Sequence, residues 1–300
     1  MRILLLGATG QVGGELRRSL AGLGQVVAAT RSGELDGVAC EVADFGCPDT
    51  LPHLVDRVAP SVVVNAAAYT AVDRAEQERE AAFQANAEGP LRLAQACAAS
   101  GAKLVHYSTD YVFDGESRRP YREDDATSPL GVYGASKLAG ELAIREWCPD
   151  HLIFRTAWVY GVRGHNFMRT MLRLGAEREE LRVVADQIGS PTPAYLIADL
   201  TAEALTQQLR TGTYHLVASG ETSWYGFAQA IMAGALSRNI LQRAPRVVAI
   251  ATSEFPTPAR RPAYSLLDNT LLATALGHPI PDWEAGLSRV TFDLSQLNSG

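Results

Sequence analysis

The chain has 300 residues, of which 47% are hydrophobic and 20% charged, as is typical of an enzyme-sized globular protein. Its formal net charge of −6 argues against binding to nucleic acid or to an anionic membrane, which both require basic surfaces. The four cysteines are widely spaced and lack a zinc-binding pattern, which predicts free thiols in a reducing compartment. The first apolar run is too short for a signal peptide or a membrane span, so we expect a cytoplasmic protein.

The first half of the chain alternates short apolar runs with amphipathic stretches. Buried strands are predicted at residues 2–6, 25–30, 61–66, 103–108 and 151–156, and helices at residues 12–21, 47–58, 81–100 and 133–147. Such alternation builds a parallel sheet with helices on both faces. The sequence therefore predicts an α/β protein with a Rossmann-type doubly wound parallel sheet over residues 1–158.

Beyond residue 158 this rhythm is interrupted by clusters of glycine and proline, as is common in substrate-binding elaborations. We assign residues 159–300 mainly to a smaller C-terminal substrate-binding domain. A helix at 194–209 and a strand at 213–217 stand out in this region, and we expect segment 194–217 to return to the first domain.

A glycine-rich turn follows the first strand directly. The turn reads Gly7-Ala8-Thr9-Gly10-Gln11-Val12-Gly13 and leads into the first predicted helix. Glycines allow the backbone to approach a pyrophosphate, and a helix N-terminus offers free amide protons and the positive end of its dipole. We predict a dinucleotide site that includes Gly7, Gly10, Gln11, Val12 and Gly13, although the spacing is looser than Gly-x-Gly-x-x-Gly.

The choice of dinucleotide is predicted from the end of the second strand. An acid at this point favours NAD, and an arginine favours the 2′-phosphate of NADP. The strand ends without an acid and is followed by Arg31, so NADPH is the expected cofactor, with NADH as the alternative. Asp44 is expected near the adenine, and the small side chains of Ala66, Ala67 and Ala68 beneath the cofactor.

Only two of the 27 basic residues are lysines, and one of them, Lys137, lies four positions after Tyr133. Residues four apart share one face of a helix. A cation about 5 Å from a phenol favours the phenolate by roughly 3 kcal/mol, or about two pKa units, at an effective dielectric constant of about 20. The pair therefore predicts a proton donor and the cation that activates it.

Four motifs occur in an order that resembles the extended short-chain dehydrogenase/reductase superfamily. They are the glycine turn, residues 65–68 (Asn-Ala-Ala-Ala), residues 108–113 (Ser-Thr-Asp-Tyr-Val-Phe) and residues 133–137 (Tyr-Gly-Ala-Ser-Lys). Further segments at 71–76, 154–160, 186–192 and 256–262, followed by Tyr264, look like those of the dTDP-4-dehydrorhamnose reductase family. The similarity extends from residue 2 to about residue 287.

The resemblance implies the last step of dTDP-L-rhamnose synthesis. NAD(P)H would deliver hydride to C4 of dTDP-4-dehydro-L-rhamnose, a dTDP-sugar, and the carbonyl oxygen would take up a proton. Tyr133 would donate that proton, while Lys137 would lower its pKa and hold the nicotinamide ribose. Thr109 would donate a hydrogen bond to the carbonyl oxygen and stabilise the charge that develops there.

The same resemblance suggests how the substrate is bound. Asp110 is expected beside the sugar, and the aromatic face of Trp158 suits the apolar face of a deoxysugar. Arg260 and Arg261 could form charge-assisted hydrogen bonds to the diphosphate. Asn166 and Gln187 offer neutral donors and acceptors suited to a sugar or a base.

Some members of this family are described as magnesium-dependent dimers in which acidic side chains of both subunits meet. Glu15 matches the first acidic position and Asp293 is a candidate for the last, but Tyr195 stands where a further acid is expected. Magnesium prefers hard oxygen ligands, so a missing carboxylate weakens the site. We expect Mg²⁺ to be absent or dispensable and the protein to be a homodimer.

Two alternatives remain open at this stage. The first is a nucleotide-sugar epimerase or dehydratase, because the same motifs serve several enzymes on this fold. Dehydratases usually carry an Asp-Glu pair after the catalytic threonine, whereas Thr109 is followed by Asp110 and Tyr111. The second is a non-catalytic NADP-binding regulatory subunit similar to that of methionine adenosyltransferase.

Overall fold

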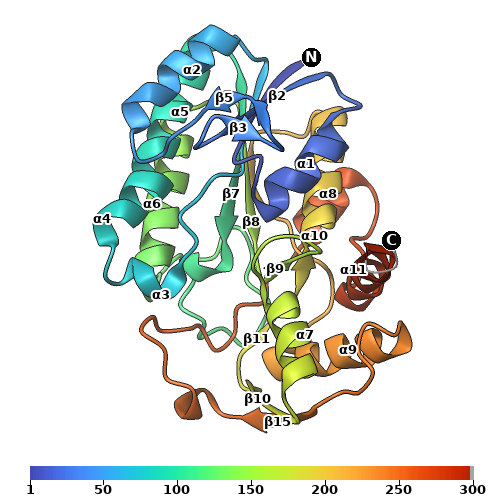
Figure 1. The fold of residues 1–300 in the computed structure, drawn as a ribbon. Coiled ribbons are helices and arrows are strands. Elements are labelled where there is room, and N and C mark those ends of the chain that lie inside the picture. The colour runs from blue at the N-terminus through green and yellow to red at the C-terminus, as the bar shows by residue number, and fades with distance from the viewer. Residues whose placement is uncertain (298–300) are drawn as a thin grey trace.

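A computed structural model describes residues 1–297 of the protein, with a seven-stranded parallel sheet at its centre (Figure 1). The strand order is β13-β8-β7-β6-β1-β2-β5. The strands are β1 (Arg2–Leu6), β2 (Gln25–Thr30), β5 (Glu41–Val42), β6 (Val62–Asn65), β7 (Lys103–Thr109), β8 (His151–Thr156) and β13 (Gly212–His215). The chain winds outward from β1 to β5, then returns beside β1 and winds through β6 to β13. This doubly wound arrangement confirms the predicted fold class.

Helices cover both faces of the sheet. Figure 1 shows α2 (Leu51–Val58), α5 (Gly89–Ser100) and α6 (Val132–Trp147) on one side, and α1 (Gln11–Leu20) and α8 (Ala194–Thr206) on the other. Side chains of β1 alternate between these layers: Ile3 and Leu5 pack in the core cluster on the α1 and α8 side, and Leu4 and Leu6 in the cluster on the α2 and α5 side. All four are fully buried, which explains why this strand is a continuous apolar run.

The predicted elements of the first half agree with the structure to within a few residues. Predicted helix 47–58 begins as a 3₁₀ turn, η1 (Pro48–Thr50), before α2. Predicted helix 81–100 consists of α4 (Arg79–Phe83), the π-helical turn η2 (Gln84–Glu88) and α5. Asn86 in η2 donates to Tyr69 O and Ser136 Oγ, both at 3.0 Å, and this buried bonding favours the wider turn.

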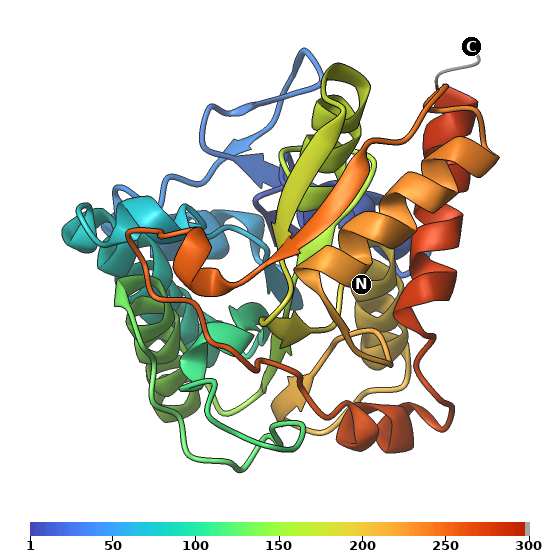
Figure 2. The same cartoon turned by 90° about the horizontal axis from the view of Figure 1, so that it is seen from below.

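Most elements beyond β8 form a second group, and Figure 1 shows α7, α9, β10 and β15 of this group below the carboxyl edge of the sheet. They include three two-stranded pairs: β9 (Val159–Tyr160) with β12 (Thr192–Pro193), β10 (Glu180–Val184) with β15 (Arg246–Ile250), and β11 (Ile188–Gly189) with β14 (Thr222–Ser223). The helices of this group are α7 (Phe167–Glu177), α9 (Trp224–Ser237), α10 (Thr270–Leu276) and α11 (Trp283–Leu297). Figure 2 shows β10 beside β15 and α9 beside α11.

Segment 194–217 contributes α8 and β13, and β13 pairs in parallel with β8 at the edge of the main sheet. The division of the chain at residue 158 remains a prediction. The remaining short elements are β3 (Glu34–Leu35), β4 (Val38–Ala39), α3 (Val72–Ala75), η3 (Asp110–Val112) and η4 (Thr252–Glu254). Within residues 1–297 no helix has both the length and the apolar character needed to cross a membrane.

Candidate active site

The glycine turn lies at the point where the strand order reverses, between β1 and β6. Gly7 has a positive φ of +76°, and a Cβ atom on it would lie 2.7 Å from Ala67 N. A Cβ atom on Gly13 would lie 2.1 Å from Gly7 O. Gly10 precedes α1 without a side-chain cap, so the first amide groups of α1 are free for a ligand. A phosphate-bearing dinucleotide fits this place by backbone shape and helix dipole.

Of the other predicted cofactor contacts, some side chains already bind other residues of the protein and one does not. Gln11 accepts a 2.8 Å hydrogen bond from Asn166 Nδ2, which ties the turn to the start of α7. Asp44 accepts from Gly46 N at 2.9 Å. Arg31 is exposed at the end of β2 and has no ion-pair partner within residues 1–297. Its guanidinium is therefore available to a 2′-phosphate.

The predicted catalytic residues lie on two adjacent elements, β7 and α6. Thr109 ends β7 and is 5% exposed, while Tyr133 and Lys137 lie one turn apart on α6. Burial and the Asp110 carboxylate raise the pKa of Tyr133, Thr109 opposes them, and the resulting pKa is about 12. The Thr109 side chain and the Tyr133 phenol therefore lie close together at the carboxyl edge of the sheet.

Lys137 is oriented differently from the sequence-based expectation. Its Nζ donates to Tyr107 O at 2.6 Å and lies 3.3 Å from His106 Nε2, so the ammonium points at β7. Burial lowers the pKa of Lys137 to about 8, and Glu141 partly opposes this. Asp110 and Thr109 are the side chains that act on the Tyr133 phenol in this arrangement, and the effect of Lys137 on the Tyr133 pKa stays a prediction.

Asp110 is the most constrained polar residue at this edge, with an exposed fraction of 1%. Its Oδ1 accepts from Thr109 Oγ1 at 2.9 Å, and Ser265 supplies a further hydrogen bond. Its Oδ2 is buried and has no hydrogen-bond partner in the described part of the chain. Burial raises the pKa of Asp110 to about 6. An orphaned carboxylate oxygen of this kind suits a hydroxyl group of a bound substrate.

Trp158 lies at the entrance to the second group of elements in a strained backbone conformation, with φ of +49°. Its ring stacks on Trp224 at a centroid distance of 3.5 Å and an interplanar angle of 5°. Trp224 thus covers one face of Trp158, and Gly189 lies so close to the ring that a Cβ atom there would be 2.6 Å from its Cε2, so only the remaining part of the ring is left for a sugar. The sequence reasoning missed Trp224, since nothing in the local pattern brings residue 224 to residue 158.

The predicted contacts to the nucleotide half gather around two adjoining clefts. The larger, of about 690 Å³, is lined by side chains that include Gln187, Trp224 and Arg261. The smaller, of about 500 Å³, includes Arg260 and Arg261. Arg261 is held by Asp73 at 2.8 Å, while Arg260 is exposed. Thr109, Tyr133 and Lys137 do not line these clefts, so the clefts suit the nucleotide half of the substrate and not its reacting carbon.

The two neutral candidates have different surroundings. Asn166 caps α7 by accepting from Arg169 N at 3.0 Å, and its Nδ2 donates to Gln11 Oε1 and to Gly161 O. This side chain joins the glycine turn to α7 and has little capacity left for a ligand. Gln187 donates to Thr252 Oγ1 at 3.1 Å and lines the larger cleft, and within residues 1–297 no further side-chain hydrogen bond engages it.

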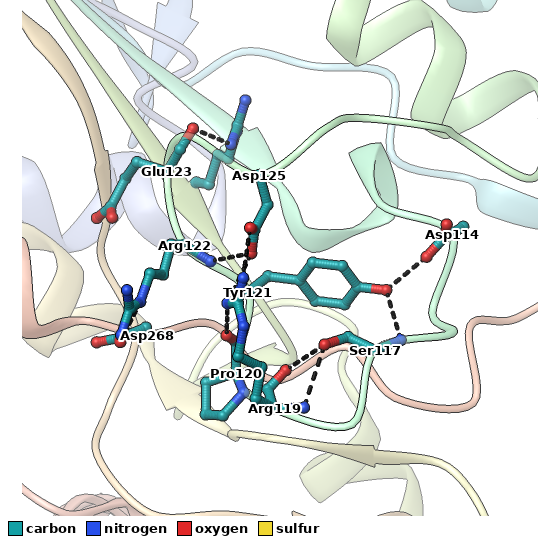
Figure 3. Close-up of polar contacts among 10 residues, drawn as sticks. Asp114, Ser117, Arg119, Pro120, Tyr121, Arg122, Glu123, Asp125 and Asp268 are labelled. Carbon is teal, nitrogen blue, oxygen red and sulfur yellow. Dashed lines mark hydrogen bonds and ion pairs between the residues drawn. The ribbon is translucent and has the colours of Figure 1, made fainter.

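The loop between Thr109 and Tyr133 is anchored by polar contacts (Figure 3). Tyr121 donates its hydroxyl proton to Asp114 at 2.5 Å and accepts from Ser117 N at 3.1 Å, while Arg119 forms a two-pronged ion pair with Asp125. The backbone of Tyr121 also pairs with residues 266 and 268. The loop therefore fixes the segment that carries Ser265, which in turn bonds Asp110.

The weak metal candidates lie on the face formed by α1, α8 and α11. Glu15 lies 3.5 Å from Arg18, which binds Asp199 at 2.6 Å. The Arg289 guanidinium lies 3.9 Å from the ring centroid of Tyr195, and Asp293 is close enough to influence that phenol. In residues 1–297 no cluster of three or more His, Cys, Asp or Glu side chains could hold a metal ion. Arginines supply the positive charge on this face.

The protein combines a doubly wound parallel sheet with a glycine turn at the switch point of the strand order and with Thr, Tyr and Lys side chains near the carboxyl edge. This combination is that of a dinucleotide-dependent oxidoreductase of the short-chain dehydrogenase/reductase type. The family model described as the RmlD substrate binding domain matches residues 1–295. The chain therefore belongs to this family.

Relatives of known identity agree over nearly the whole chain. A dTDP-4-dehydrorhamnose reductase of Burkholderia thailandensis is 50% identical over 98% of this chain and 99% of its own. One of Escherichia coli K12 is 46% identical over 98% of each. The structure of a dTDP-4-dehydrorhamnose reductase of Bacillus anthracis in complex with NADP has a TM-score of 0.88 and 36% identity, and covers 97% of this chain and 99% of that one. The family resemblance predicted from the sequence is confirmed.

Proposed function

We infer that this protein is an NAD(P)H-dependent oxidoreductase that reduces the C4 keto group of dTDP-4-dehydro-L-rhamnose to give dTDP-L-rhamnose. The observation that carries the inference is the meeting of Thr109 and Tyr133 at the carboxyl edge of the sheet, beside the glycine turn. Relatives named dTDP-4-dehydrorhamnose reductase, at 46–50% identity over almost the whole length, support this substrate over that of an epimerase or dehydratase. They also favour an enzyme over a regulatory subunit.

The residues of the glycine turn fit a dinucleotide because a Cβ atom at Gly7 or Gly13 would fill the space that the turn leaves. Gly7, Gly10, Gln11, Val12 and Gly13 would hold the pyrophosphate side. Arg31 would favour NADPH, in line with the NADP bound to the Bacillus anthracis relative. Asp44 and residues 66–68 would contact the rest of the cofactor. When bound, the reduced nicotinamide supplies the hydride.

The protein's own groups would handle the proton and the developing charge. Thr109 and Tyr133 lie close together at this edge, so both would donate hydrogen bonds to the C4 oxygen as it becomes negative, Thr109 by turning its hydroxyl away from Asp110 Oδ1. The pKa of Tyr133, about 12, keeps the phenol protonated at neutral pH, so transfer of its proton depends on groups that stabilise the phenolate. Lys137 would hold the nicotinamide ribose, and its charge would stabilise the phenolate left after proton transfer.

Substrate recognition would divide between the carboxyl edge and the clefts. We propose that the orphaned Oδ2 of Asp110 accepts from a sugar hydroxyl and that Trp158, backed by Trp224, contacts the deoxysugar. Gln187, Arg260 and Arg261 would bind the nucleotide half. We do not retain Asn166 as a substrate contact, because its amide already serves α7 and the glycine turn.

The decisive experiment is NADPH oxidation at 340 nm with freshly generated dTDP-4-dehydro-L-rhamnose, repeated with NADH and with excess EDTA. We expect stoichiometric oxidation with dTDP-L-rhamnose as product and little effect of EDTA. Tyr133→Phe should lower turnover by roughly 10² or more while leaving NADPH binding intact. Tight NADPH binding without oxidation would sink the proposal and favour a regulatory subunit or another keto sugar.

Three further expectations from the sequence accompany this function. They are a homodimer, a cytoplasmic location and a division into a Rossmann domain at 1–158 and a mainly substrate-binding domain at 159–300. Light scattering at several concentrations tests the first, cell fractionation the second, and limited proteolysis with and without NADPH the third. A monomer at all concentrations would remove the dimer from the proposal.

A further inference from the structure

A buried chain of hydrogen bonds connects residues 66–68, here called the cofactor loop, with Lys137. The proposed mechanism makes no use of this chain. Asn65 ends β6, is 1% exposed, and accepts a 3.1 Å hydrogen bond from Ala67 N through its Oδ1. Its Nδ2 lies 3.1 Å from Nδ1 of His106, the residue beside it in β7. His106 is fully buried, and its Nε2 lies 3.3 Å from Lys137 Nζ.

The donors and acceptors in this chain cannot all be satisfied when Lys137 is charged. Because the Ala67 amide fixes Asn65 Oδ1 as an acceptor, Asn65 Nδ2 must donate, and His106 Nδ1 must accept. A neutral imidazole then carries its proton on Nε2. That N–H faces Lys137 Nζ, and an ammonium group has no lone pair with which to accept it.

Protonation of Lys137 therefore requires a different arrangement of its neighbours. An ammonium needs His106 Nε2 as an acceptor, which moves the His106 proton to Nδ1. Asn65 must then turn its carbonyl oxygen toward His106 and give up the Ala67 amide. A neutral amine, in contrast, accepts from Nε2 and still donates to Tyr107 O.

The other charged groups near Lys137 do not remove this conflict. On its own helix, Glu141 is held by two ion pairs, to Arg155 at 2.8 Å and to Arg145 at 2.6 Å. Tyr133 is neutral over the working range of pH, since burial raises its pKa to about 12. Burial of Lys137 lowers its own pKa to about 8, and burial lowers the pKa of His106 well below its ordinary value. These directions agree with a neutral imidazole beside a readily discharged amine.

We propose that Asn65 and His106 are positioning residues that set the protonation state of Lys137, with the Ala67 amide, Asn65 and His106 together favouring the neutral amine. When Lys137 becomes protonated, the His106 proton must then move to Nδ1 and the Asn65 amide must turn over. Asn65 thereby loses its hydrogen bond from the Ala67 backbone amide in the cofactor loop. This proposal depends on the proposed function in one respect, namely that Lys137 takes part in the reaction together with Tyr133.

The test uses the full-length protein and exploits its two lysines. Protein labelled with ¹³C at lysine Cε gives two signals, and Lys103→Arg identifies the one from Lys137. Lys103 lies beside Asp150, where strand β7 begins, and serves as the internal reference. The titration of the Lys137 signal is compared between the wild type and Asn65→Asp. The isosteric aspartate accepts from both Ala67 N and His106 Nδ1 and forces the reversed tautomer, and its negative charge raises the Lys137 pKa in the same direction, so the ¹⁵N shifts of His106 are needed to identify the tautomer itself.

We expect the Lys137 midpoint near pH 8 in the wild type and higher by about one pH unit or more in Asn65→Asp, with the Lys103 signal unchanged. A Lys137 midpoint that does not move in Asn65→Asp would overturn the proposal. A second measurement does not depend on any variant being fully active. The ¹⁵N shifts of His106, assigned by their loss in His106→Phe, should place the wild-type proton on Nε2. A proton on Nδ1 would refute the proposal by itself.

Activity provides a separate readout. If charged Lys137 stabilises the phenolate, the rate of NADPH oxidation by the wild type should fall as pH rises through about 8. In Asn65→Asp the midpoint of this fall should lie at higher pH. The two spectroscopic measurements need neither substrate nor turnover. A protein that passes both but oxidises no NADPH would therefore contradict the proposed function and leave the role of Asn65 and His106 standing.

Discussion

Asp110→Asn should stabilise the protein at pH 8 while weakening its binding of the sugar. Burial raises the pKa of Asp110 from 3.8 to about 6, so the native state resists ionisation of this group. Each pKa unit corresponds to about 1.4 kcal/mol, so the ionised carboxylate destabilises the fold by up to about 3 kcal/mol above pH 6. Asparagine removes that charge and keeps an acceptor for Thr109 and Ser265. For 300 residues this gain corresponds to a rise in Tm of about 4–5 °C.

The dependence on pH makes this prediction specific. Because the folded pKa of Asp110 is raised, its ionisation costs stability as pH rises from about 4 to about 6, and the cost is constant above that. The advantage of Asp110→Asn in thermal melts should therefore shrink as pH falls through this window. Asp114→Asn is the matched control: the Tyr121 hydroxyl lowers the Asp114 pKa, so this substitution should cost stability at pH 8 and nothing at low pH. An advantage of Asp110→Asn that is the same at pH 4 and pH 8 would refute the reasoning.

Three further substitutions test the remaining parts of the site. Gly13→Ala places a Cβ atom 2.1 Å from Gly7 O and should abolish NADPH binding in calorimetry, whereas Gly14→Ala meets nothing within 4 Å and should bind normally. Arg31→Ala should weaken NADPH binding about tenfold, or by about 1.4 kcal/mol, and leave NADH binding unchanged; equal losses would exclude a 2′-phosphate contact. Glu141→Gln leaves Arg155 charged and buried, and should lower the free energy of unfolding in denaturant by about 3–5 kcal/mol. Glu177→Gln, which removes an exposed ion pair with Arg173, is the control and should have little effect.

The central sheet and the catalytic set were predictable because their signals are local. The run at residues 3–6 is apolar throughout since both faces of β1 are buried, and Gly7 and Gly13 are required because a Cβ atom on either would lie only 2.7 or 2.1 Å from backbone atoms. Tyr133 and Lys137 share a helix, so their spacing alone places them side by side. Arg31 could be anticipated for the same reason, because it directly follows a strand whose ending determines the cofactor choice.

The tertiary structure decided what depends on contacts between distant segments. Lys137 turns toward His106 and Tyr107 on β7, where the Tyr107 carbonyl oxygen accepts a 2.6 Å hydrogen bond from its Nζ. Trp224 reaches Trp158 only because β14 pairs with β11. Asn166 caps α7 and also donates a hydrogen bond to Gln11, which lies 155 residues earlier in the chain. The rise in the Asp110 pKa on burial is likewise opposed by Ser265, far along the chain. Residue type and spacing thus determined which groups are candidates for the chemistry, whereas the protonation and orientation of those groups follow from neighbours that only folding brings together.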